Sequence, residues 1–275
     1  MQISRLWRRG VAAACLTVLP LGAAMAVSSE DEEEEELEFD EAFIFFELNN
    51  TDGDLGIHSK VDGGPWKYIT IEDPQERRML KVRTNGRLRQ QGLTELFFES
   101  AEPTFDELDP AVFFKRFPAG IYEVEGMGTD GSELESETEL THLIPAQPEP
   151  TLNGIPYVQD CDDEDSIPQF SADEDIVIEW AAVTLSHPVL GTTNVPIEVV
   201  NYEVVVEIDD TPFKVSAILP ADASSFVVPE EILALGDEIK YELLVREASW
   251  NQTAVESCFL VEGEDDDEDD GDDDD

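Results

Sequence analysis

The fold class is decided by residues 201–219, which read NYEVVVEIDDTPFKVSAIL. Apolar and polar side chains alternate from Tyr202 to Ile208 and again from Phe213 to Leu219. A period of two is typical of strands that bury one face. The intervening residues, Asp-Asp-Thr-Pro, favour a turn. The segment therefore predicts two antiparallel strands joined by a short connection.

Similar short apolar runs surround this pair, with almost no helical period. They lie at residues 157–158, 176–180, 226–228, 241–245 and 257–261. Together with the first pair they predict seven strands separated by turn signals. That pattern is typical of a β-sandwich, so we expect an all-β fold.

Four side chains in this region stand at informative positions: Trp180 on the second predicted strand, Tyr202 opening the third, and Leu235 followed six residues later by Tyr241. In this combination, residues 146–262 resemble a fibronectin type III domain, which has a core Trp and a tyrosine corner. The resemblance implies that the phenol of Tyr241 bonds back to the preceding turn. It also implies a binding or spacer module, because the fold hosts many roles.

Residues 42–145 predict a second sandwich. Strands are expected at 43–48, 56–61, 66–71, 79–83, 87–89, 93–99, 118–124 and 138–144, with turns at 49–54 and 62–65. Asp109 and Pro110 are typical of a helix start, which predicts a helix from Pro110 to Phe117. This half resembles the N-terminal part of exported bacterial proteins that carry a fibronectin type III module, which implies an immunoglobulin-like fold. Pro145, Pro148 and Pro150 indicate a stiff linker between the domains.

Residues 79–89, MLKVRTNGRLR, are the most basic stretch outside the N-terminal leader. They hold four cations at alternating positions: Lys81, Arg83, Arg87 and Arg89. The Asn-Gly pair predicts a hairpin with a three-residue loop and a left-handed Gly86, which puts the cations on one face and Val82 and Leu88 on the other. The cations either pair with carboxylates of the same domain or contact an anionic partner, such as an acidic flank or a glycan.

Export is predicted by the first 26 residues. Three arginines precede a short apolar run, and Ala24-Met-Ala26 fits a signal peptidase site, so cleavage is expected between Ala26 and Val27. No later apolar run is long enough to span a bilayer. We therefore expect a periplasmic or secreted protein.

Two cysteines, Cys161 and Cys258, remain after removal of the signal. An even number in an exported chain favours a disulfide, which would join the two ends of the C-terminal domain. The alternative is a pair of buried thiols.

The chain is strongly acidic, with 65 Asp and Glu against 16 Lys and Arg and a net charge of −49. Repulsion excludes a nucleic-acid binder that works through phosphate contacts. Residues 27–41 and 263–275 are so rich in acids that we expect both segments to be disordered. They either solvate the protein or bind calcium weakly.

A metal site is not predicted elsewhere. Neither alignment of residues 49–54 with an EF-hand loop supplies the required ligands, so Asp52 and Asp54 are named only as candidate ligands for calcium. No other cofactor is expected.

Catalytic residues are not apparent: His58, His142 and His187 are scattered singly, and no Ser or Cys has a nucleophile context. We therefore expect a non-enzymatic binding or spacer protein with an unknown protein or glycan partner. A carbohydrate-binding or hydrolase-accessory module is the alternative, because Trp250 lies in the polar loop 248–253 and could contact a sugar. Calcium-dependent surface or matrix assembly is a third possibility.

Overall fold

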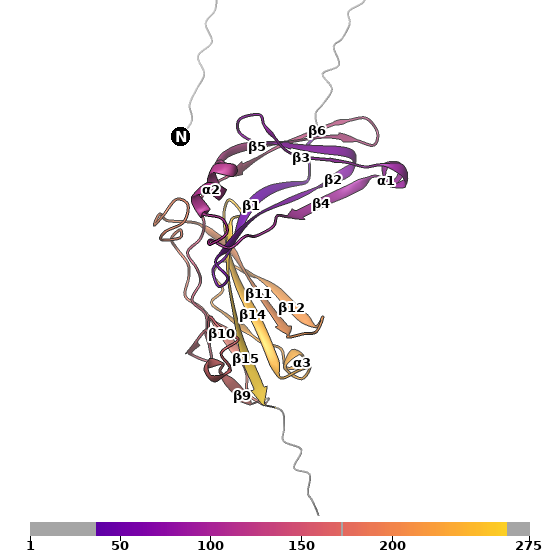
Figure 1. Ribbon diagram of the computed structural model, residues 1–275. Helices are drawn as coiled ribbons and strands as arrows, with labels where there is room; N and C mark the ends of the chain where they lie inside the picture. Colours follow the sequence, from indigo (N-terminus) through magenta and orange to yellow (C-terminus); the bar gives the residue numbers. More distant parts are fainter. Residues whose placement is uncertain (1–36, 172, 263–275) are drawn as a thin grey trace, which may run out of the picture. The chain divides into compact units, whose positions relative to one another are not determined.

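The computed structural model describes residues 37–171 and 173–262 (Figure 1). Strands dominate these ranges and form two sheets, which confirms the all-β sandwich class. The predicted signal peptide, its cleavage site at Ala26 and Val27, and nearly all of the acidic flanks lie outside the described residues.

The C-terminal half places a small sheet against a large one. The small sheet has the order β13 (Ser225–Val227), β10 (Val177–Glu179), β7 (Thr151–Leu152) and β8 (Ile155–Pro156). The large one has β12 (Lys214–Pro220), β11 (Val199–Ile208), β14 (Glu238–Glu247) and β15 (Gln252–Glu262), with β9 (Gln169–Ser171) beside β15. A 3-10 turn (Glu164–Ser166) and a short helix, α3 (Glu230–Leu233), lie in the connections. This arrangement is fibronectin type III-like.

The predicted pairing of residues 201–219 is confirmed. β11 and β12 are antiparallel neighbours, with Val204 opposite Ala217. Tyr202, Val204 and Val206 are fully buried, so the alternation does orient one face into the core. The first strand, predicted near residues 157–158, is displaced by a few residues: strand pairing occurs at β7 and β8, whereas the Val158 N–H donates to the side chain of Ser257 and not to a strand backbone.

Aromatic rings fill this core. Trp180 is 5% exposed and its ring lies 5.3 Å from that of Tyr202. The predicted tyrosine corner is not formed, because the Tyr241 hydroxyl is buried beside Ser257 and does not reach the backbone of the preceding turn.

The N-terminal half contains six strands, two helices and its own apolar core. The strands are β1 (Glu41–Asn49), β2 (Asp54–Glu72), β3 (Arg78–Arg83), β4 (Leu93–Glu99), β5 (Gly120–Gly128) and β6 (Glu133–Leu140), and the helices are α1 (Gly86–Gln91) and α2 (Pro110–Arg116). Their order is β1-β2-β5-β6, and β3 and β4 also pair with β2. The predicted helix is confirmed as α2, capped by the Asp109 side chain, which accepts from the Ala111 N–H at 2.8 Å.

Strand β2 corrects one predicted turn. The chain does not reverse at residues 62–65 but continues through them as a single bent strand. The pairing with β4 shifts register between Asp62 and Trp66, which is a bulge. Glycine and proline inside a strand are typical of such irregularities. The bulge separates the part of β2 that pairs with β1 and most of β4 from the part that pairs with β3 and β5.

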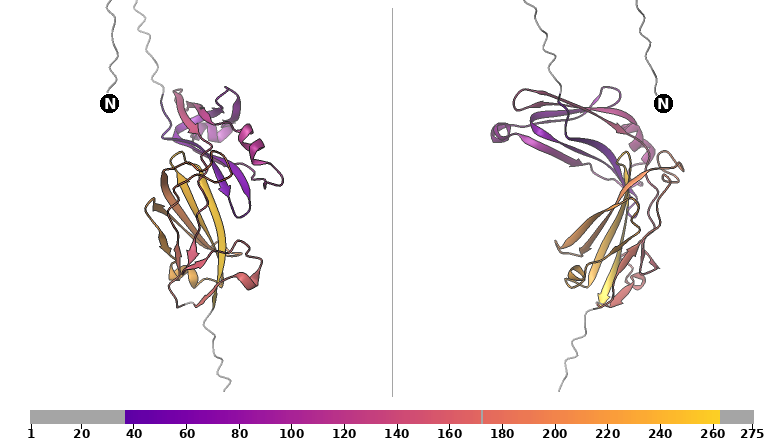
Figure 2. Two further views of the ribbon diagram at one scale, coloured as in Figure 1. Left: turned by 90° about the vertical axis from the view of Figure 1, so that its left-hand side faces the viewer. Right: turned by 180° about the vertical axis from the view of Figure 1, so that it is seen from behind.

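The two halves share one sheet. β1 pairs in parallel with β15, with Glu47 opposite Gln252, and the indigo β1 can be seen to meet the yellow β15 in Figure 2. Asn251 joins the halves further: its side-chain oxygen accepts from the Phe46 N–H at 2.8 Å, and its amide donates to Leu143 O at 3.1 Å. The two cores are separate clusters, but the division into domains at residues 145 and 146 stays a prediction.

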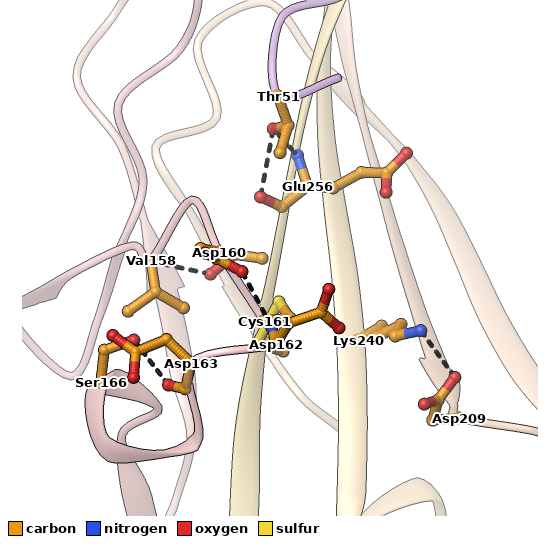
Figure 3. Close-up of a disulfide and its surroundings, with 12 residues drawn as sticks. Thr51, Val158, Asp160, Cys161, Asp162, Asp163, Ser166, Asp209, Lys240 and Glu256 are labelled. Atoms are coloured by element: carbon orange, nitrogen blue, oxygen red, sulfur yellow. Dashed lines mark hydrogen bonds and ion pairs between the residues drawn. A yellow bond between two sulfur atoms is a disulfide. The ribbon is translucent and has the colours of Figure 1, made fainter.

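The predicted disulfide is confirmed, because Cys161 and Cys258 are bonded (Figure 3). The bond ties the segment between β8 and β9 to the middle of β15. Close by, the side chain of Thr51 bonds to both backbone groups of Glu256, which attaches the β1–β2 turn to the same strand.

Candidate functional site

Lys81 and Arg83 share the outward face of β3, as predicted. Both are exposed, while Val82 between them packs against the N-terminal core. The ring of Tyr68, on the neighbouring β2, lies beneath them: the Lys81 Nζ is 5.0 Å and the Arg83 guanidinium 5.9 Å from its centroid. These cation–π contacts hold the two charges over one ring.

The predicted hairpin beyond Arg83 is wrong. Gly86 does adopt a positive φ of 58°, but residues 86–91 form α1 instead of a returning strand. Residues two apart on a helix point about 200° apart, so Arg87 and Arg89 do not share one face. Leu88 is 53% exposed rather than packed opposite Val82. The Asn-Gly pair was therefore a helix start rather than a hairpin loop.

More cations gather along β3 than the sequence predicted. Arg77 and Arg78 at its start line a cavity of about 430 Å³ together with Lys115 and Arg116 from α2. With the four predicted cations, eight basic residues lie along β3 and at its two ends, and we call this group the basic edge: Arg77, Arg78, Lys81, Arg83, Arg87, Arg89, Lys115 and Arg116.

The four predicted cations have no ion pair with any other described residue, so the described part of the chain does not supply the first of the two alternatives, local pairing with surface carboxylates. Cations elsewhere do pair: Lys60 lies 2.5 Å from Glu41, and Lys240 lies 2.7 Å from Asp209. Within the basic edge only Arg77 and Arg78 pair, with Asp73 and Glu72.

The backbone of β3 is also open. Among the described strands β3 pairs only with β2, so its other side is a sheet edge. Unpaired N–H and C=O groups on such an edge can accept an additional strand.

Trp250 is not the exposed loop aromatic that the sequence predicted. It is half-buried, with its ring centroid 4.3 Å from that of Phe43 on β1. Its φ of 74° belongs to a tight turn between β14 and β15. Trp250 therefore packs at the junction of the two halves, which removes the observation that favoured a sugar-binding site.

A chain of polar side chains crosses the junction on the outer face of the shared sheet. It runs from one half to the other through Glu203, Arg246, Gln252, Glu47, His58 and Glu102. Arg246 Nε donates to the Gln252 oxygen at 2.7 Å, and His58 lies 3.0 Å from Glu102. Burial raises the pKa of Glu47, and His58 opposes the rise. Because the steps from Glu203 to His58 join neighbouring strands, they favour the observed register at the junction, and Glu102 joins the chain from the loop after β4.

Beside this chain, acidic groups from several segments face a cavity of about 400 Å³. The lining carboxylates are Asp52, Asp160, Asp162, Glu207, Glu242 and Glu256, and the lining lysines are Lys214 and Lys240. Burial and the neighbouring glutamates raise the pKa of Glu242 to about 8. This side chain is therefore largely protonated at neutral pH.

Calcium binding at Asp52 and Asp54 stays a prediction. Asp52 accepts a bond from the Asn49 side chain at 3.2 Å. Burial, followed by the nearby Glu102 and Asp52, raises the pKa of Asp54 to about 6. Within residues 37–171 and 173–262, no three His, Cys, Asp or Glu side chains are grouped to hold a metal ion.

The three histidines lie in unrelated environments. His58 contacts Glu102, His142 lies 2.9 Å from Phe117 O, and His187 accepts from the Leu190 N–H at 3.0 Å. The structure does not bring them together into one site. None of the described helices combines the length and the apolar composition needed to cross a bilayer.

Comparisons with known proteins give structural likeness only. No protein-family model matches the chain, and no curated protein matches it. Among solved structures it is similar to the Clostridium thermocellum CbhA fibronectin(III)-like modules (9% identity, 84% of this chain and 93% of that chain, TM-score 0.27). It is also similar to the FN1-FN3 domains of chicken CNTN1 (10% identity, 82% of this chain and 65% of that chain, TM-score 0.32).

A third similar structure comes from a 1.5-MDa bacterial ice-binding adhesin, described for its retention on the host cell surface (10% identity, 82% of this chain, 66% of that chain, TM-score 0.25). The chain thus spans just under two thirds of the adhesin and CNTN1 structures. Such scores transfer no activity or partner to this chain. The fold assignment rests on the strand order itself, which is that of an all-β protein whose C-terminal half is fibronectin type III-like.

Proposed function

We propose that the protein is an exported, non-enzymatic β-sandwich module that binds an extended acidic polypeptide along β3. The observation that carries the proposal is the basic edge, which gathers eight of the 16 lysines and arginines of a chain with a net charge of −49. The four predicted cations, Lys81, Arg83, Arg87 and Arg89, have no carboxylate partner among the described residues, so they are available to an external anion.

The geometry favours a polypeptide as the ligand. Lys81 and Arg83 are two residues apart on one face of a strand, which places them ~6.7 Å apart along it. Alternate carboxylates of an extended peptide repeat at the same distance. Such a peptide can pair with the open edge of β3 through its backbone while its carboxylates meet the cations.

The rest of the fold supports a spacer role for the same module. The parallel pairing of β1 with β15 and the bonds of Asn251 connect the two cores. The disulfide closes the C-terminal half. A binding edge on a connected scaffold is presented in a defined orientation to its partner.

The test uses fluorescein-labelled octaglutamate and fluorescence anisotropy with the mature chain at 50 mM salt. We expect Lys81→Glu to weaken binding at least about ten-fold, since it removes one charge-assisted contact and adds a repulsive one. The matched control is Lys214→Glu, an exposed and unpaired lysine on β12. Equal affinities for the two variants, or no binding by the unmodified chain, would refute the proposal.

A further inference from the structure

Two Asn-Gly pairs occur in the chain, Asn85-Gly86 at the start of α1 and Asn153-Gly154 in the turn between β7 and β8. In such a pair the backbone nitrogen of the glycine can attack the side-chain carbonyl carbon of the asparagine, because glycine has no Cβ to hinder the approach. Hydrogen bonds that hold the asparagine side chain elsewhere prevent the two groups from reaching this geometry. The two pairs differ in how firmly the fold holds the asparagine.

Asn153 is held on both sides of its amide group. Its side-chain oxygen accepts from the Val177 N–H at 2.8 Å, and its Nδ2 donates to Asp175 O at 3.1 Å. Its backbone N–H donates to Val177 O at 2.9 Å. Rotation of the side chain toward Gly154 would break both side-chain bonds, so the fold protects this asparagine.

Asn85 is exposed and loosely held. Although it is the N-cap residue of α1, its side chain accepts no bond from the helix, and among the described residues it makes one hydrogen bond, from Nδ2 to Arg83 O at 3.3 Å. As the first residue of α1, Gly86 has an N–H without an acceptor inside the helix. A Cβ on Gly86 would meet no atom within 4 Å beyond its chain neighbours and its own helix, so the space around this peptide bond is open to water.

We propose that Asn85 is a deamidation site and that its conversion to an acid weakens the binding of acidic polypeptides at the basic edge. The nitrogen of Gly86 forms a bond to Cγ of Asn85 while the Cγ–Nδ2 bond breaks, and Nδ2 leaves as ammonia with the proton displaced from the Gly86 nitrogen. Water then adds to one of the two carbonyls of the resulting succinimide and opens the ring. The product is aspartate or isoaspartate at position 85, and water is the only co-reactant.

The new carboxylate lies among the four predicted cations, since position 85 is two residues from Arg83 and two from Arg87. There it competes with the carboxylates of an external polypeptide for the same cations. The expected loss is about two- to five-fold in affinity, which is the scale of one exposed ion pair. This consequence rests on the proposed function, whereas the chemistry at Asn85 does not depend on it.

Mass spectrometry of the mature chain after incubation at mildly alkaline pH tests the modification site. We expect peptides that contain position 85 to gain the mass of an acid in place of an amide and to be labelled by an isoaspartate-specific methyltransferase, while Asn153 of the folded protein remains an amide. In urea the two asparagines should react at similar rates, because only the fold separates them. Equal rates in the folded protein, or an intact Asn85 under conditions in which the unfolded chain reacts, would overturn the site.

Two variants of one residue test the effect on binding. Asn85→Asp supplies the acid at once, and Asn85→Gln retains an amide that does not close the same ring. We expect Asn85→Asp to bind labelled octaglutamate about two- to five-fold more weakly than Asn85→Gln, and incubation to weaken binding by the unmodified chain but not by Asn85→Gln. Equal affinities for these variants, with Lys81→Glu still impaired, would overturn the effect on binding and leave the proposed function standing. Absence of binding in every chain would overturn the proposed function and the effect on binding, while mass spectrometry decides the modification site independently.

Discussion

Asn251→Ala should destabilise the protein more than any other single amide-to-alanine change in the shared sheet. Asn251, in the C-terminal half, is fully buried and bonds to the N-terminal half: to the Phe46 N–H at 2.8 Å, Thr141 Oγ1 at 2.9 Å and the carbonyls of Leu143 and Thr141 at 3.1 and 3.2 Å. Alanine cannot replace any of these bonds.

The magnitude follows from the groups left behind. A buried donor or acceptor without a partner costs about 1–3 kcal/mol. The Phe46 N–H and two carbonyls lose their Asn251 partner, and relaxation recovers part of the loss, so we expect a decrease of about 3–5 kcal/mol in the free energy of unfolding. A domain is stable by only about 5–15 kcal/mol, so the change is large.

Urea unfolding, followed by tryptophan fluorescence and circular dichroism, measures this decrease. Because Asn251 links the two cores, the variant should also unfold in two steps where the unmodified protein unfolds in one. Gln90→Ala, on the exposed surface of α1, is the matched control and should change stability by less than about 0.5 kcal/mol. A loss below about 1 kcal/mol for Asn251→Ala, with a single transition, would show that the junction is not held by this side chain.

Three further outcomes are expected. The pKa of Glu242 is about 8 in the folded protein and lower in the unfolded chain, so the folded state holds the extra proton between these two values, and the free energy of unfolding should fall as pH rises from 5 to 9. Glu242→Gln should flatten this pH dependence in urea titrations. An unchanged pH dependence in the variant would contradict the burial of this acid. Reduction of Cys161–Cys258, which closes 97 residues, should lower stability by up to about 4–5 kcal/mol in thermal melts, and an unaltered melting temperature would count against it. Val82→Asp should lower the free energy of unfolding by about 2–4 kcal/mol because Val82 packs on the core, whereas the exposed Leu88→Asp should be tolerated. Equal losses of stability in the two variants would favour the predicted hairpin over α1.

The strands were predictable where one face is buried. The alternation in residues 201–219 reports burial directly. The helix start at Asp109–Pro110 was predictable for another reason, because capping depends only on neighbouring residues. The disulfide was predictable from the even cysteine number in a chain predicted to be exported, without its geometry.

The errors have a common cause, which is that long-range packing decides between local alternatives. Gly86 takes the same positive φ in a hairpin as in the observed turn into α1, so the local signal could not separate them. Residues 62–65 carry turn chemistry, yet pairing on both sides keeps β2 extended. Trp250 was expected in solvent because its loop is polar, but Phe43, more than 200 residues away, covers it.

The candidate site was predictable only in part. The four cations were visible as a sequence cluster, but Lys115 and Arg116 join them only through the fold. Tyr68, which lies beneath Lys81 and Arg83, carries no signal beyond its alternation with the core residues Ile69 and Ile71. The open edge of β3 is a property of the sheet order and could not be read from the chain.

The binding claim is tested most directly by an NMR titration of the mature chain with unlabelled octaglutamate at low salt. Amide chemical-shift changes should be confined to Met79–Gln91 and the adjoining Lys115 and Arg116, and 300 mM salt should reverse them. Changes centred on any other surface, or no changes at millimolar peptide, would contradict an acidic-polypeptide site on β3.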